Sequence, residues 1–160
     1  MPKTPNVRPR PAPPTTVVLH ATGPGTLQGA VAWLTNPQSG VSAHYVIGKA
    51  GEVVRLADPV REIAWHAGAS RGPGGKPANA ASVGIELVNR NDGKDPYPRA
   101  QLLALADLLR RLKRAIPTLR WLTTHRDVCL PPGRKTDPLG LEIAPLAEAC
   151  GLTVWTRGMA

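Results

Sequence analysis

The chain has few cysteines, few acidic residues and no long apolar run, and each shortage excludes a class of protein. Two cysteines among 160 residues are too few for a fold held together by disulfides. No run approaches the roughly 18 apolar residues that span a bilayer. The 18 prolines and 16 glycines are spread along the chain and exclude a coiled coil, while 42% hydrophobic residues exclude a disordered tail. The length therefore predicts one domain with a substantial core.

The shortage of acids leaves a strong positive charge. Eleven Asp and Glu stand against 20 Lys and Arg, so the formal net charge is +9. This excess predicts an anionic partner: nucleic acid, a membrane surface or a cell-wall polymer. Lys3, Arg8 and Arg10 lie in the proline-rich start, and we expect residues 1–14 to form a flexible basic arm before a single domain over 15–160. The same start has no apolar leader segment, which predicts synthesis in the cytoplasm without a signal peptide.

Strand and helix patterns alternate along the chain. Runs rich in β-branched residues predict strands, the second and third joined as a hairpin, at Thr15–His20, Ser42–Gly48, Gly51–Ala57, Ser82–Val88 and Trp121–His125. Apolar stripes at helical spacing predict helices at Thr26–Leu34, Arg99–Ile116 and Leu139–Cys150. Gly68–Ala81 is rich in Gly and Pro and is expected to be a long functional loop. This order predicts a three-layer α/β domain with a central mixed β-sheet flanked by helices.

Two of the predicted strands end in histidine, at His20 and His125. The carboxyl ends of parallel strands meet at one edge of a sheet, where ligands of α/β proteins bind. Asp137 follows twelve residues after His125. Two imidazoles and one carboxylate are a ligand set for catalytic zinc, with a fourth position left open. Each residue alone has an ordinary alternative, because a buried histidine can be a hydrogen-bonded core residue and an Asp before Pro is a common turn former.

Six segments of the chain, taken together, are more specific than any of these signals. They are VVLHAT (17–22), VSAHYVIGKAGEVVRL (41–56), AWHAG (64–68), SVGIELVN (82–89), THRDV (124–128) and PGRKTDP (132–138). In this order they resemble the zinc-dependent N-acetylmuramoyl-L-alanine amidases, a family that includes phage endolysins and peptidoglycan recognition proteins. The resemblance covers about residues 15 to 150. It implies that residues 15–160 form one catalytic amidase domain.

The resemblance also implies where the chemistry takes place. His20 and His125 match the two zinc-binding histidines, and Asp137 matches the third ligand, which is an aspartate in the muropeptide-recycling branch. Glu86 matches the glutamate of that branch, and Lys135 matches the lysine near the third ligand. Under this assignment Zn²⁺ activates a water, Glu86 moves the proton to the leaving amine, and Lys135 stabilises the oxyanion. The bond broken is the amide between N-acetylmuramic acid and L-alanine.

Three further residues are expected to contact substrate. His66 matches a family position near the substrate cleft, and a structural role is its alternative. Trp65 and Asn79 are expected to line the same groove, whose wall would be the loop Gly68–Ala81.

Other residues have structural interpretations that require no role in catalysis. Tyr45 lies two residues after the position of the catalytic tyrosine in phage-lysozyme-type members, so we expect it to pack in the core. Cys129 does not occupy the third-ligand position and is expected to be a buried thiol. Glu86 in an apolar strand requires a partner, and an ion pair with a neighbouring Arg or Lys is the alternative to a role at zinc. Pairing of Cys129 with Cys150 is left open.

Three functions remain to be compared. An active zinc amidase acting on peptidoglycan or muropeptides is favoured over a peptidoglycan-binding module without catalysis, because all three ligands are present. Nucleic-acid binding is disfavoured because the sequence has no recognition motif such as a helix-turn-helix or zinc-finger spacing. Within the amidase interpretation, the net charge favours an endolysin attracted to an anionic cell envelope, whereas Asp137 and Glu86 resemble muropeptide-recycling enzymes. A monomer is expected.

Overall fold

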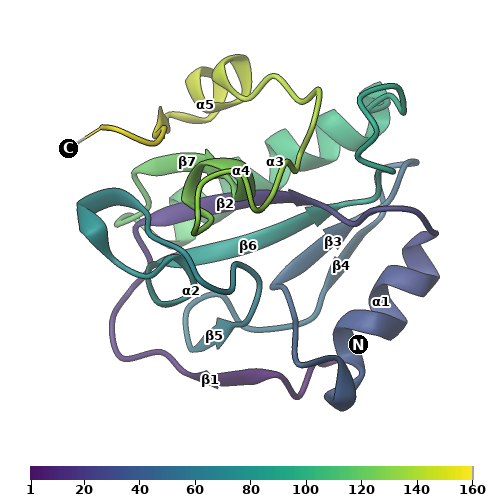
Figure 1. Cartoon of the computed structure of the whole chain (residues 1–160), viewed down its shortest axis with the longest axis horizontal. Coiled ribbons are helices and arrows are strands. Elements are labelled where there is room, and N and C mark those ends of the chain that lie inside the picture. Colours follow the sequence, from purple (N-terminus) through teal and green to yellow (C-terminus); the bar gives the residue numbers. More distant parts are fainter. Residues whose placement is uncertain (160) are drawn as a thin grey trace.

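A computed structural model of the chain, which describes residues 1–159, contains a six-stranded sheet flanked by helices (Figure 1). Its strands are β2 (Thr16–Ala21), β3 (Tyr45–Ile47), β4 (Val53–Arg55), β6 (Ser82–Leu87), β7 (Trp121–Thr124) and β8 (Thr153–Val154). They lie in the order β4-β3-β6-β2-β7-β8. Neighbours are parallel except for the antiparallel β3–β4 hairpin. The predicted α/β fold with a central mixed sheet is confirmed.

The helices cover both faces of this sheet. They are α1 (Leu27–Thr35), α2 (Ala78–Ala81), α3 (Arg99–Ala115), α4 (His125–Val128) and α5 (Ala144–Cys150). Successive residues of a strand point to opposite faces. Val17 and Leu19 of β2 accordingly join the core beneath α3 and α5, whereas Val18 between them packs with residues of α2 and α4. On the same side as Val18, α1 packs through Leu34 against β3. The predicted three layers are therefore present.

Helix α3 follows its predicted bounds closely. Its buried side chains include Leu105, Leu109 and Leu112, which repeat every three or four residues on one face. Proline precedes the helix, and Lys113 and Arg114 lie in its last turn, where positive charge offsets the helix dipole. The basic residues at this end are thus consistent with a solvated helix terminus.

Two other segments differ from expectation. The predicted loop Gly68–Ala81 contains a 3₁₀ turn at Pro73–Gly75 and the short helix α2. The last helix begins at Ala144, five residues later than predicted, behind a turn at 138–140. Both segments contain Gly and Pro, which disfavour helices, so the sequence pattern did not indicate where the short helices begin.

The start of the chain is part of the folded domain, so the prediction of a flexible arm is wrong. Strand β1 (Val7–Pro9) pairs antiparallel with β5 (Glu62–Ala64), forming a second, two-stranded sheet (Figure 1). Thr4 and Asn6 are buried. The amide of Asn6 donates to the carbonyl oxygens of Asn36 and Val41, at 2.9 Å each. These tertiary partners have no signature in the local sequence.

Arg10 fastens the same segment to the main sheet. Its Nη1 donates to the carbonyl of Ala80 at 2.8 Å, its Nη2 to the carbonyl of Ser82 at 2.7 Å, and its Nε to the carbonyl of Glu62 at 3.3 Å. Burial lowers the pKa of Arg10 to about 10, which leaves the guanidinium charged at neutral pH. One charged side chain therefore joins β5, α2 and β6.

The two cysteines are free and buried. Cys129 is fully enclosed, which confirms its expected place as a buried thiol, and Cys150 ends α5. Within residues 1–159, none of the helices is long and apolar enough to cross a membrane.

We predict that Arg10→Ala lowers the free energy of unfolding by about 1–3 kcal/mol, because the carbonyl groups that it binds lose a charged donor. Urea denaturation with linear extrapolation measures this. Arg8→Ala is the matched control: it removes the same charge from an exposed position on β1 and should leave stability nearly unchanged. Equal stability of the two variants would contradict the prediction.

Candidate metal centre

The parallel register of the sheet brings the candidate residues to one edge. His20 in β2 lies directly opposite Glu86 in β6. On the other side of β2, Leu19 lies opposite Thr124, the last residue of β7. His125 is the first residue of α4 rather than the last of the strand, because Thr124 caps this helix by accepting a hydrogen bond from the Asp127 amide. The predicted meeting of the two histidines at the carboxyl edge is confirmed.

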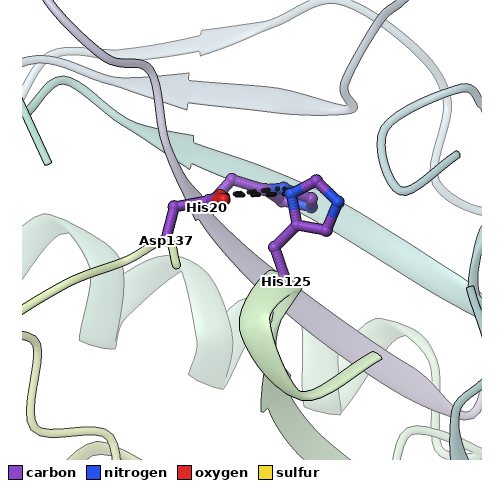
Figure 2. Close-up of side chains that lie close together, drawn as sticks. All are labelled: His20, His125 and Asp137. Atoms are coloured by element: carbon purple, nitrogen blue, oxygen red, sulfur yellow. Dashed lines mark hydrogen bonds and ion pairs between the residues drawn. The ribbon is translucent and has the colours of Figure 1, made fainter. Parts of the chain in front are cut away.

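His20, His125 and Asp137 converge there in a buried cluster (Figure 2). The two Nδ1 atoms of the histidines are 3.0 Å apart. Asp137 Oδ2 lies 3.2 Å from Nδ1 of His125 and 3.5 Å from Nδ1 of His20. Ligands about 2.0–2.1 Å from a tetrahedral zinc are about 3.3 Å from one another. The three distances therefore fit a zinc-sized cation.

The chemistry of these donors also fits zinc. Burial lowers the pKa of His20 to about 4, so its imidazole is neutral at pH 7 and can offer a lone pair. Asp137 Oδ2 also accepts a hydrogen bond from the Ala21 amide at 3.3 Å, which orients the carboxylate. The three residues, one of them anionic, all line one cleft, so a ligand from solvent could complete a tetrahedral site. This is the arrangement of a catalytic rather than a structural zinc site.

Glu86 lies beside the cluster without belonging to it. Its Oε1 is 4.0 Å from Nδ1 of His20, and its side chain is 14% exposed. Burial raises the pKa of Glu86 to about 8, with a smaller contribution from the Asp137 carboxylate and opposition from the Lys135 ammonium. Its Oε2 is buried with no hydrogen-bond partner among the described residues. No described residue forms an ion pair with Glu86 other than His20 at 4.0 Å, so the Arg or Lys partner considered from sequence is not found.

Lys135 is exposed and lines the same cleft, two residues before Asp137. Its loop is held in place by Asn91, whose Nδ2 donates to the Thr136 hydroxyl at 3.0 Å and whose Oδ1 accepts from the Leu139 amide at 2.6 Å. Asn91 has a φ of 59°, in the left-handed region that Asn tolerates. Sequence reasoning missed this residue because the contact spans 45 positions.

The three residues expected to touch substrate take different positions. His66 lines the cleft, but its Nδ1 lies 2.9 Å from Nε2 of His20 and its Nε2 lies 3.1 Å from the Ser82 hydroxyl. Asn79 accepts hydrogen bonds through Oδ1 from the backbone amides of His66 and Ala67. Trp65 is 37% exposed and lies outside the lining of the metal cleft. Their substrate contacts stay predictions.

The structure adds an apolar wall to this cleft. Trp33 of α1 and Val41 line it, and their side chains are 58% and 37% exposed. The sequence analysis did not identify either residue, and Trp33 lies off the apolar stripe of its helix. Tyr45 packs in the core beneath α3, which confirms its predicted role.

Fold and site together define an α/β domain with a candidate metal centre of two histidines and one aspartate at the carboxyl edge of a mixed sheet. Residues 10–140 match the family described as N-acetylmuramoyl-L-alanine amidase. The chain belongs to this family.

Individual relatives agree with the family assignment. The chain is 33% identical over 138 residues to the N-acetylmuramoyl-L-alanine amidase AmiD of Escherichia coli K12, covering 76% of this chain and 48% of AmiD. It spans about half the length of the curated relatives it matches. A crystal structure of an AmpD selenomethionine derivative superposes with a TM-score of 0.77 at 29% identity, covering 94% of this chain and 92% of AmpD. A complex of E. coli AmiD with the substrate anhydro-N-acetylmuramic acid-L-Ala-D-γ-Glu-L-Lys gives 0.74 at 27% identity, covering 94% and 63%.

We predict that the purified chain holds one Zn²⁺ and that Asp137→Ala loses it, because two neutral imidazoles alone do not complete the site. Metal analysis after dialysis against a mild chelator measures the stoichiometry. Cys129→Ala is the control, since this thiol is a potential zinc ligand close in sequence but hydrogen-bonded to backbone carbonyls instead. Loss of zinc in Cys129→Ala, or its retention in Asp137→Ala, would contradict the ligand assignment.

Proposed function

We propose that the chain is an enzyme that hydrolyses the amide bond between N-acetylmuramic acid and L-alanine in peptidoglycan. The main support is that the His20–His125–Asp137 cluster, Glu86 and Lys135 all line one cleft. Membership of the amidase family and the bound substrate of AmiD support the choice of bond.

The residues divide the reaction between them. A bound Zn²⁺ would polarise the scissile carbonyl and acidify a water molecule. Glu86 accepts the proton of the attacking water at a carboxylate oxygen and delivers it to the departing amine of L-alanine. A cation held by His20, His125 and Asp137 would favour the carboxylate form of Glu86 and so oppose the effect of burial on its pKa. The Lys135 ammonium stabilises the negative charge that develops on the carbonyl oxygen.

A peptidoglycan-binding module without catalysis is the alternative from another class. Binding alone requires neither a complete ligand set nor a buried carboxyl group beside it. Glu86 pays a desolvation cost in this position. The presence of both the complete ligand set and the buried Glu86 carboxyl group therefore favours an enzyme over a binding module.

The physical form of the substrate is a finer question. We propose the intact wall, with the chain acting as an endolysin that is made in the cytoplasm and reaches the wall after release. The net charge of +9 supports this, because it attracts the chain to an anionic polymer. The muropeptide-recycling role has its own support, since AmiD and AmpDh3 of Pseudomonas aeruginosa were solved with soluble anhydromuramic peptides.

We predict that Glu86→Gln lowers turnover of a soluble muropeptide by about 10²–10⁴-fold, because the amide cannot accept the proton of water. The zinc content should stay at one per chain, since Glu86 is not a ligand. Release of free stem peptide, followed by chromatography, measures turnover. Glu148→Gln, at an exposed position on α5, should behave as wild type. Wild-type turnover in Glu86→Gln would remove this residue from the chemistry.

We predict faster cleavage of intact sacculi than of small muropeptides at low salt, with the preference falling as salt is raised. The reason is screening, whose length shrinks from about 10 Å at 0.1 M to about 3 Å at 1 M. Parallel assays of both substrates across this range measure the ratio. A preference for muropeptides that is independent of salt would support the recycling role instead.

A further inference from the structure

The dipeptide His66–Ala67 lies directly behind both histidine ligands. We propose that this dipeptide orients the two imidazoles so that each presents Nδ1 to the metal, and that His66 is a positioning residue that acts through a hydrogen-bond relay ending at Ser82. The inference deepens the proposed zinc-dependent function and rests on its metal site.

The relay runs from a backbone carbonyl to the first ligand, and the chemistry of its groups fixes the direction of every proton. The Ala78 carbonyl can only accept, so the Ser82 hydroxyl, 2.5 Å away, donates to it. Because its only proton is donated to Ala78, Ser82 Oγ accepts a hydrogen bond from Nε2–H of His66 at 3.1 Å. Nδ1 of His66 is then a lone pair and accepts from Nε2–H of His20 at 2.9 Å. His20 is left with its lone pair on Nδ1, the atom in the metal cluster.

The second ligand is fixed by the neighbouring carbonyl. Nε2 of His125 lies 3.2 Å from the carbonyl oxygen of Ala67, to which it donates. The proton of His125 is therefore on Nε2 and its lone pair on Nδ1, which faces Asp137 Oδ2. Arg134 donates to the same carbonyl through Nη2 at 3.1 Å and holds it in place.

The surrounding chain is built to hold this dipeptide. Oδ1 of Asn79 accepts from the amides of His66 at 3.1 Å and Ala67 at 2.8 Å, so one side chain holds both. Gly84 leaves room for the imidazole, because a Cβ at that position would lie 2.4 Å from Cγ of His66. A glycine inside a central strand weakens the strand, and the close approach of the His66 ring accounts for it here. Arg10 binds the Ser82 carbonyl at the far end of the relay.

Substitutions along the relay test its role in metal binding. His66→Phe keeps a planar ring without an acceptor, and Ser82→Ala removes the group that fixes the His66 tautomer. Each should weaken zinc binding about 10- to 100-fold, as loss of partners of metal-ligating histidines does elsewhere. His66→Asn restores an acceptor near the Nδ1 position and should bind zinc more tightly than His66→Phe. Competition with a chromophoric chelator measures the zinc Kd independently of enzyme activity.

A second measurement reads the relay directly. Nitrogen-15 NMR of the metal-free protein distinguishes histidine tautomers, and wild-type His20 should carry its proton on Nε2. In Ser82→Ala a fraction of His20 should carry the proton on Nδ1 instead. A merely structural role of Ser82 would not change the tautomer.

Ser70→Ala is the matched control. Its hydroxyl accepts from the Ala78 amide and so contacts the same end of α2 as Ser82, but it lies outside the relay. It should leave the zinc Kd and the His20 tautomer unchanged, with urea denaturation reporting the stability of each metal-free variant.

Zinc affinities of His66→Phe and Ser82→Ala within about twofold of wild type would overturn the relay, and so would an equal loss in Ser70→Ala. A wild-type chain that binds zinc and responds to these substitutions, yet cleaves no muropeptide, leaves the relay standing and overturns the proposed function.

Discussion

Parallel pairing of β2 with β6 and β7 is the constraint on which the site depends. In this register His20 lies opposite Glu86, while β7 ends one residue short of the position opposite His20. His125 can then leave the strand, begin α4 and turn its ring back over the sheet edge (Figure 2). A slip of one residue would send His20 to the opposite face of the sheet. Such a slip would place the polar imidazole of His20 in the apolar core that Val17 and Leu19 fill, where it would lack hydrogen-bond partners. Packing of the sheet and geometry of the metal site therefore share one cause.

The second constraint is the cost of burying so many polar groups. His20, His66 and His125 are almost fully enclosed, and each imidazole has two nitrogens that require partners. Burial lowers the pKa of His66 well below its ordinary value, which keeps this imidazole neutral and able to accept a hydrogen bond. The partners come from the protein on the side away from the cleft and leave Nδ1 of both ligands facing Asp137. Glu86 Oε2 is buried without a partner among the described residues, which is consistent with the proton-transfer role that we propose for this carboxyl group.

The sequence predicted the features that are local or that are carried by motifs. Apolar periodicity located α3 and the central strands within a few residues, and the ordered segments located the three residues of the candidate metal cluster. Contacts between distant segments were not predictable in this way. Strand β1 has no β-branched alternation and is extended because β5 pairs with it. Asn79, which is predicted to line the substrate groove, also accepts hydrogen bonds from the backbone amides of His66 and Ala67, and its sequence neighbours do not indicate these contacts. Local propensity carries no information about such partners.

The N-terminal segment changes how the net charge should be understood. Counted from sequence, Lys3, Arg8 and Arg10 are equal contributors to an attraction for anionic polymers. In the fold Arg10 is committed to three backbone carbonyls, and Lys3 lies 3.9 Å from the Glu62 carboxylate. Of the three, Arg8 is exposed and its guanidinium has no hydrogen-bond or ion-pair partner within residues 1–159. Because Arg10 binds the carbonyl of Ser82, removing the segment would disturb the surroundings of His66 as well as the surface charge. Removing the segment would then lower activity on soluble and on polymeric substrates alike. A segment that only bound the chain to the wall would affect the polymeric substrate alone.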